Sequence, residues 1–252
     1  MKTLMQQVEH EMDMNQALKA WDLVKESEDA DLKQKVWFKV KHAFNDEDYK
    51  AYYMNDLREY PMRDEIAFDC MKHDARFRWL MPKLMDQFPK SVLDIGCADG
   101  YLGLTLGRYG IKSVGLNLYG PSVNLANERA SQNHLPARFK QMDYRDYKEQ
   151  HEAVVFFEIL EHLPDPERAI AKAYELTRDG GRLYISTPVA EKHIGIAGHL
   201  ADKTREAWDA DDKPAGHLQL FTEEEFKDLL KPYNLVDYYI DEEFSQEAMI
   251  QK

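Results

Sequence analysis

The sequence predicts an α/β fold, in which a mostly parallel sheet is wrapped by helices and preceded by a helical extension. Apolar residues recur at spacings of three and four up to residue 88, which indicates helices. From Lys90 onward, short apolar runs alternate with helical stretches, the pattern of a parallel sheet. Two final apolar runs fit a closing antiparallel hairpin. The 252 residues, 44% of them hydrophobic, suffice for one such domain and an extra helical element.

The helical extension is expected to cover residues 1–88, and the α/β domain residues 89–252. The apolar residues that follow the helical repeat in the extension are Leu18, Trp21, Val24, Leu32, Val36, Val40 and Phe44. A last helix, from Asp64 to Gln87, would place Phe77, Leu80 and Leu84 against the following domain. We expect this extension to act as a lid, or as an arm that joins two copies of the chain into a homodimer.

Each apolar run of the α/β domain is assigned to a strand. The expected strands are Ser91 to Ile95, Ser113 to Leu116, Ala137 to Gln141, Ala153 to Phe157, Arg182 to Ser186, Leu235 to Ile240 and Phe244 to Ile250. The expected helices are Gly100 to Tyr109, Ser122 to Asn133, Pro166 to Thr177 and Thr222 to Leu230. The long segment from Val189 to Leu220 is read as a functional loop, because structureless stretches of that length in compact domains are usually functional.

Composition restricts the partners and the compartment. The formal net charge of −13 repels phosphate backbones, so we do not expect nucleic acid as a partner unless basic residues gather on one face. Cys70 and Cys97 lack the paired spacing of a disulfide framework or a thiolate metal site, which is typical of a cytoplasmic protein. No run of about 18 apolar residues occurs, so we expect neither a membrane span nor export.

A glycine-punctuated turn follows the first expected strand and opens a helix. Such a turn lets the backbone approach a ligand closely, and taken alone it fits the pyrophosphate of a dinucleotide equally well. Asp94, two residues before Gly96, and Gly100, four residues after it, make the turn resemble the first motif of class I S-adenosylmethionine-dependent methyltransferases. The resemblance continues in order through residues 114–117, 141–143, 157–166, 179–183 and 186–188.

The resemblance covers residues 90–252 and implies a Rossmann-like class I sheet, mostly parallel, with seven strands of which the last is antiparallel. It implies that the glycine turn cradles the methionine part of S-adenosylmethionine, with Asp94 assisting its amino group, and that Asp143 accepts from the adenine amino group. Asp143 has the alternative role of capping the next turn. The full set of cofactor-binding candidates is Asp94, Gly96, Cys97, Ala98, Gly100, Asn117, Leu118, Met142, Asp143, Tyr144 and Phe157.

Asn117 departs from the family pattern, which usually has an acid at this position to accept bonds from both ribose hydroxyls. An amide accepts one bond and donates the other, and it loses the strength of a charged acceptor. We therefore expect weaker cofactor binding, or a substitute acceptor elsewhere. On the sequence alone, Asn117→Asp is predicted to tighten S-adenosylmethionine.

Acidic and imidazole side chains follow the fourth expected strand. Glu158, Glu161 and His162 stand at i, i+3 and i+4, which is the spacing of one helical face. With His217 from the long loop, they resemble the metal site of small-RNA 3′-end ribose methyltransferases and the Glu-x-x-Glu-His segment of ubiquinone-pathway O-methyltransferases. These four residues are the catalytic candidates and the candidate ligands for Mg²⁺, Mn²⁺ or Zn²⁺. The alternatives are a metal-free general base, His162 or His217, and a purely structural Glu161 and His162 pair.

Three functions follow from these residues. The first is O-methylation of a hydroxyl on a small molecule or sugar, because the reaction residues resemble those of O-methylating enzymes and the chain is acidic. The second keeps the chemistry but places the acceptor on an RNA ribose, which a positive groove leading to Glu158 would favour. The third is a non-catalytic subunit with the same fold, which the Asn117 replacement permits.

Overall fold

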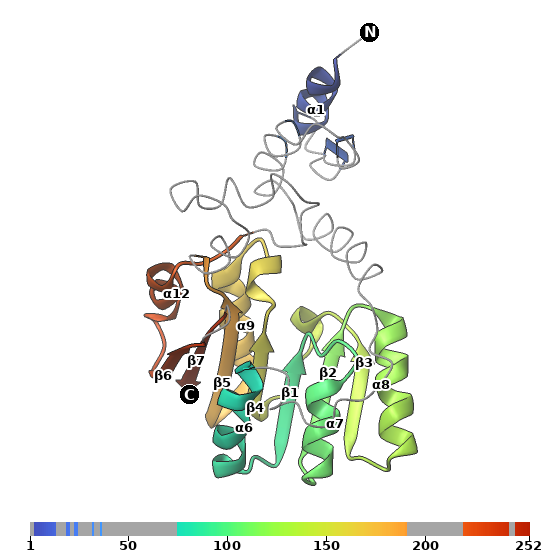
Figure 1. Cartoon of the computed structure of the whole chain (residues 1–252), viewed down its shortest axis with the longest axis vertical. Helices are drawn as coiled ribbons and strands as arrows, with labels where there is room; N and C mark the ends of the chain where they lie inside the picture. Colours follow the sequence, from blue (N-terminus) through green and yellow to red (C-terminus); the bar gives the residue numbers. More distant parts are fainter. Residues whose placement is uncertain are drawn as a thin grey trace.

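The computed structural model of the chain describes residues 3–13, 19–20, 23–24, 32, 36, 75–190, 219–241 and 245–252. Within these residues a seven-stranded sheet has the strand order β3-β2-β1-β4-β5-β7-β6 (Figure 1). Strands β1 to β5 pair in parallel, whereas β7 runs antiparallel to both β5 and β6. The expected fold class, with its antiparallel last strand, is confirmed.

All seven expected strands are present, and most bounds agree to within two residues. The strands are β1 Ser91–Ile95, β2 Lys112–Asn117, β3 Ala137–Gln141, β4 His151–Phe157, β5 Thr177–Pro188, β6 Leu235–Ile240 and β7 Ser245–Gln251. The largest difference is β5, which begins five residues earlier than expected. In its register with β4, His151 is opposite Thr177 and Ala153 is opposite Arg182. The extra residues on β5, which include Gly180 and Gly181, therefore form a bulge within the strand and not a loop before it.

The described helices are α1 Leu4–Asp13, α6 Ala75–Gln87, α7 Tyr101–Arg108, α8 Gly120–Gln132, α9 Pro166–Leu176 and α12 Glu223–Leu230, with short 3₁₀ turns η2 Tyr144–Asp146 and η3 Leu160–His162. Asp165 caps α9, and Thr222 with Glu225 forms a capping box at α12, as the polar residues before these helices predict. The C-terminal part of the helix expected from Asp64 to Gln87 is present as α6. Residues 64–74 lie outside the described residues.

The sheet is buried between two helical layers. Leu93 of β1 and Phe156 of β4 pack in one apolar cluster with residues of α9 and α12. Val92 and Val155, their neighbours along the same strands, pack on the opposite face with residues of α6 and α7. Adjacent strand residues therefore face opposite layers, as the period of a strand requires.

The strand order changes direction between β1 and β4. Chain connections on the two sides of this point use helices on opposite faces, so a crevice opens at the carboxyl ends of β1 and β4. This is where doubly wound α/β folds bind ligands, and both the glycine turn after β1 and the acidic segment after β4 begin there.

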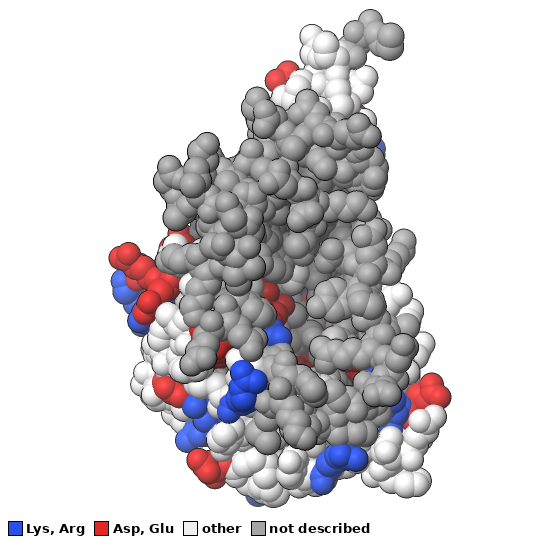
Figure 2. Space-filling view, viewed as in Figure 1, with Lys and Arg blue, Asp and Glu red and all other residues white. Residues whose placement is uncertain are grey.

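Most of the N-terminal extension lies outside the described residues, so the boundary at residue 88 stays a prediction. Phe77, Leu80 and Leu84 of α6 do pack against the sheet, as expected for the last helix before it. Among the described residues, no helix combines the length and the apolar character needed to cross a bilayer. On the described part of the face in Figure 2, acidic and basic side chains are interspersed.

Candidate active site

The turn after β1 has the backbone conformation that its glycines predict. Gly96 and Gly100 have φ values of 79° and 85°, in the left-handed region that glycine adopts without strain. Ala98, between them, also has a positive φ of 46°. A Cβ atom on Gly96 would lie 2.1 Å from Cδ1 of Ile159, and one on Gly100 would lie 2.6 Å from Cβ of Ala126. Gly100 is therefore required by close approach as well as by conformation, whereas at Gly96 the close atom is the end of the Ile159 side chain and the positive φ is the requirement.

A pocket lies beside this turn and collects residues from four segments of the chain. Its lining comprises Ile95, Gly96, Leu116, Asn117, Leu118, Met142, Asp143, Tyr144 and Ile159. Six of the expected cofactor-binding residues are thus brought together: Gly96, Asn117, Leu118, Met142, Asp143 and Tyr144. The mixture of a glycine turn, apolar walls and two polar side chains suits a nucleoside.

Five expected cofactor residues do not line this pocket. Cys97 is buried and packs against Gly115, so it fills space behind the turn. Phe157 instead contacts the rings of Phe77 and Trp79, with centroids 6.1 and 6.5 Å away. The other three are Asp94, Ala98 and Gly100, which shape the turn from outside the pocket lining.

The pocket is narrow. Its free volume is about 30 Å³, enough for a water molecule or two. The side chain of Ile159 fills the space next to Gly96. The lining residues therefore have the chemistry that a nucleoside needs, and admission of one requires the Ile159 side chain to turn away from Gly96.

The amide of Asn117 joins the two loops that border the pocket. Its Nδ2 donates to the carbonyl of Ala98 at 3.3 Å, and its Oδ1 accepts from the backbone N–H of Tyr119 at 3.2 Å. A carboxylate at this position would keep the second bond and lose the first. The structure thus gives a reason for an amide here that the sequence does not show.

Asn117→Asp is therefore predicted to weaken binding of S-adenosylhomocysteine, by about threefold to tenfold, which reverses the sign expected from the sequence. Loss of one net hydrogen bond, about 0.5–1.5 kcal/mol, loosens the turn at Ala98. Titration calorimetry of both proteins measures the change. Tighter binding by the variant would show that a ribose contact outweighs the bond to Ala98.

Asp143 has the capping role that was its alternative interpretation. Its Oδ1 accepts from the backbone N–H of Arg145 at 3.0 Å and thereby caps η2. The guanidinium of Arg145 also binds the carboxylate through two nitrogens, the shorter contact being 2.7 Å. Asp143 still lines the pocket, so its carboxylate is held in a fixed direction at the pocket wall.

Asp94 is buried at the end of β1, where it is 7% exposed. Desolvation raises the pKa of its carboxyl from 3.8 to about 7. The charge of this group therefore changes near neutral pH. Burial also raises the pKa of the Cys97 thiol, with the charge of Asp94 as a further cause, so this cysteine is an unreactive thiol.

Glu158 begins the acidic segment in a strained conformation. Its φ of 53° is unusual for a residue with a side chain, and such strain is often found at functional sites. Its Oε1 accepts from the hydroxyl of Ser186 at 2.8 Å, and its Oε2 lies 3.3 Å from Nη1 of Arg76. Three elements, β4, β5 and α6, therefore hold this carboxylate in place.

Glu161 is fully buried in η3, next to Glu158. Its Oε2 accepts from the hydroxyl of Thr187 at 3.2 Å, and its Oε1 has no hydrogen-bond partner among the described residues. Nε2 of His162 lies 3.9 Å from that oxygen. Desolvation, reinforced by the charge of Glu158, raises the pKa of the Glu161 carboxyl well above its ordinary value. A buried acid and an imidazole are thus adjacent at the carboxyl end of β4.

The helical spacing expected for the three side chains is only partly present. The turn η3 begins at Leu160, so Glu158 precedes it and points toward Ser186 and Arg76 instead. Across the part of the chain that the structure describes, no three acidic, imidazole or thiol groups gather as a metal would require. His217 lies outside the described residues, and the expected metal site stays a prediction.

Three further residues near Glu158 were not foreseen. Arg76 lies on α6, and nothing in the sequence of that helix indicates its ion pair with Glu158. Ile159 lies between the two acids in the sequence, and the sequence did not indicate that it lines the pocket. Glu247 pairs opposite Ser186 on β7 and is buried, and desolvation raises the pKa of its carboxyl from 4.5 to about 8. The one signal in the sequence for Glu247 was that β7 begins with polar residues and continues with apolar ones.

Comparison with known proteins identifies the family. Residues 71–239 match the family model described as methyltransferase domain, which is more than half of the chain. Ubiquinone biosynthesis O-methyltransferase from Aeromonas salmonicida is 31% identical over 117 residues, covering 45% of this chain and 49% of that protein. The same enzyme from Glaesserella parasuis is 30% identical over 120 residues, covering 44% and 51%. The chain thus spans about half the length of the curated relatives it matches.

Solved structures share the fold at low sequence identity. Magnesium protoporphyrin IX methyltransferase from Synechocystis PCC 6803 has a TM-score of 0.59 at 13% identity, covering 84% of this chain and 98% of that one. The methyltransferase domain of bacterial CtHen1-CN has a TM-score of 0.53 at 19% identity, covering 70% and 97%. With the glycine turn, the strand order and the family match in agreement, the chain belongs to the methyltransferase domain family and has the class I S-adenosylmethionine-dependent fold.

Proposed function

We propose that this protein transfers the methyl group of S-adenosylmethionine to a hydroxyl of a small molecule or sugar. The observation that carries the proposal is the position of Ile159, which connects the pocket with the acidic segment after β4. This residue lines the nucleoside-type pocket, while Glu158 before it and Glu161 after it are held carboxyls at the end of the same strand. A cofactor in the pocket would therefore have the acidic segment beside it.

The cofactor, when bound, would supply a methyl group on a sulfonium: the acceptor oxygen would bond to the methyl carbon, and the carbon–sulfur bond would break with its electron pair going to S-adenosylhomocysteine as the leaving group. Gly96 and Asn117 would position it, and Asp143 would meet its adenine end. The acceptor hydroxyl must lose its proton as the carbon–oxygen bond forms. His162, whose Nε2 lies 3.9 Å from the buried Oε1 of Glu161, would take that proton, and Glu161 in its ionised form would stabilise the imidazolium.

O-methylation is supported by the name of the curated relatives, which are ubiquinone biosynthesis O-methyltransferases. The Glu-x-x-Glu-His segment of this chain, with Glu158, Glu161 and His162, resembles the segment of that pattern in ubiquinone-pathway O-methyltransferases. A divalent cation held by these residues and His217 is the second way to activate the hydroxyl, because a bound cation lowers its pKa.

One experiment tests the proposal and separates the two ways of activation. S-adenosylmethionine is titrated into the protein with and without Mg²⁺, Mn²⁺ or Zn²⁺, and methyl transfer is then screened over phenols, sugars and short RNAs. We expect cofactor binding and transfer to a phenol or sugar oxygen. Activity that survives chelation favours a metal-free general base, which is His162 or His217, and activity that requires a cation favours a ligand role for these residues. Failure to bind the cofactor contradicts the proposal.

A further inference from the structure

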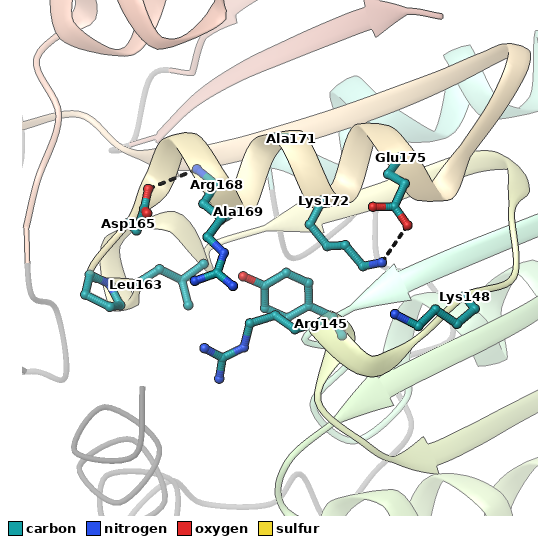
Figure 3. A pocket seen from close by; sticks show the side chains of 11 residues that line it. Arg145, Lys148, Leu163, Asp165, Arg168, Ala169, Ala171, Lys172 and Glu175 are labelled. Carbon is teal, nitrogen blue, oxygen red and sulfur yellow. Dashed lines mark hydrogen bonds and ion pairs between the residues drawn. The ribbon is translucent and has the colours of Figure 1, made fainter. Parts of the chain in front are cut away.

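A second groove lies beside the cofactor pocket, between η2 and α9 (Figure 3). Its volume is about 360 Å³, much larger than the free space next to the glycine turn. Tyr144 lines both the groove and the cofactor pocket, and Leu163 and Pro164 extend the groove to the turn that carries Glu161. The groove is therefore a neighbour of the active site and separate from it.

Basic side chains dominate the groove although the chain has a net charge of −13. Arg145, Lys148, Arg168 and Lys172 line it, against the two acids Asp165 and Glu175. Figure 3 shows Lys148 and Lys172 directing their ammonium groups into the groove from its two sides, with the guanidinium groups of Arg145 and Arg168 at its other end. The positive charge is thus concentrated where two elements face each other.

Two of the four cations are already paired. Arg145 is bound to Asp143 at 2.7 Å, and Lys172 is bound to Glu175 at 2.8 Å. The side chains of Lys148 and Arg168 are exposed, and no ion pair to a described residue holds either one. Asp165 caps the α9 helix by accepting from the backbone N–H of Arg168, so its carboxylate is directed to the backbone. Lys148 and Arg168 therefore remain available to an anion.

From this arrangement we infer that the groove binds the phosphate group of a nucleotide, either free or within an RNA chain. A guanidinium fork and an ammonium group together suit the several oxygens of a phosphate. The half-buried ring of Tyr144 provides aromatic surface beside the cations, which suits the ring that a nucleotide carries. This inference goes beyond the proposed function, because it concerns a site that neither the cofactor nor the acceptor hydroxyl requires.

The test measures binding to the full chain without S-adenosylmethionine, so its outcome is independent of the methyl-transfer proposal. The probes are uridine monophosphate, a 12-nucleotide single-stranded RNA, and uridine as the version without phosphate. The double variant Lys148→Gln/Arg168→Gln removes the two available cations and leaves the Arg145 and Asp143 pair intact. The matched control, Lys112→Gln/Arg138→Gln, removes the same charges from exposed positions on β2 and β3.

We expect at least one phosphate probe to bind, uridine not to bind, and the groove variant to lose at least tenfold in affinity while the control keeps the wild-type value. Raising the salt concentration should weaken binding, as for any contact with phosphates. Binding of uridine monophosphate alone identifies a free nucleotide, and binding of the RNA alone identifies a polymer. No binding by either phosphate probe, or equal loss in both double variants, overturns the inference. Thermal unfolding of both variants checks that each is folded.

Discussion

Replacing Glu161 by glutamine is expected to lower the rate of methyl transfer by at least about a hundredfold, the size of contribution that a positioned acid or base makes. The side chain is fully buried, and its Oε1 faces Nε2 of His162 with no hydrogen bond to a described residue. Glutamine keeps the size of the side chain and an acceptor for the hydroxyl of Thr187. Glutamine cannot ionise, so it cannot become the carboxylate that would stabilise an imidazolium or hold a cation during the reaction, and the chemistry should fail without a change of fold.

The same variant should be at least as stable as the wild type at neutral pH. Burial raises the folded-state pKa of Glu161, so the native state holds a proton that the unfolded state releases as the pH rises above its ordinary pKa. Stability therefore falls with rising pH, and glutamine abolishes that loss. Thermal unfolding at pH 5 and pH 8 measures the difference. Glu167→Gln, at an exposed position in the first turn of α9, is the control. A Glu161→Gln rate within threefold of the wild type would make the Glu161 and His162 pair purely structural.

The strands could be predicted from sequence because each is a short apolar run with a clear end. Ser91–Ile95, Ala137–Gln141 and Leu235–Ile240 have the predicted bounds. The bulge in β5 was missed because a glycine pair is read as a turn, whereas here Gly180 with φ 77° continues the strand. Thr177 and Arg182 on either side of the glycine pair are paired with β4, and the glycines themselves exchange backbone hydrogen bonds with Lys252, so tertiary pairing overrides the local preference for a turn.

The sequence predicted which residues line the pocket, but it did not predict the hydrogen bonds that these residues make. A motif places Asn117 and Asp143 at the carboxyl ends of neighbouring strands, because parallel strands end at one edge. It does not reveal that the amide of Asn117 is bonded to Ala98, or that Arg145 holds Asp143. Those contacts depend on rotamers and on loop geometry, which a one-dimensional pattern does not contain.

Contacts between distant segments were the least predictable part of the site. Arg76 forms an ion pair with Glu158, which lies 82 positions later in the chain. Glu247 lies near them because β7 pairs with β5 in a register that puts Glu247 opposite Ser186. The groove beside η2 and α9 is similar, because its four cations come from η2, from the segment after η2 and from α9, whose separate charge patterns are ordinary for solvated surfaces. Only the tertiary arrangement brings them together.

Cofactor affinity is expected to fall about a hundredfold between pH 8 and pH 5. The carboxyl of Asp94 has a pKa of about 7, and below that pH its ionised fraction, which binds the cofactor, falls about tenfold with each pH unit. The resemblance to the family assigns Asp94 to the amino group of the cofactor, which is a cation and binds the ionised form. Desolvation keeps the Asp94 carboxyl partly protonated in the free protein near pH 7. Binding must then release a proton, and the affinity rises with pH until Asp94 is fully ionised.

Titration calorimetry of S-adenosylhomocysteine at pH 5, 6, 7 and 8 measures this dependence, and buffers of different ionisation enthalpy count the protons released. In Asp94→Asn the affinity should be low and nearly constant over the same range, because the amide does not titrate. The comparison also separates Asp94 from Asp143, because only Asp94 is replaced and the ion pair of Asp143 with Arg145 is left unaltered. A wild-type affinity that is constant from pH 5 to pH 8 would mean that the amino group of the cofactor does not meet Asp94, and that this acid only supports the glycine turn.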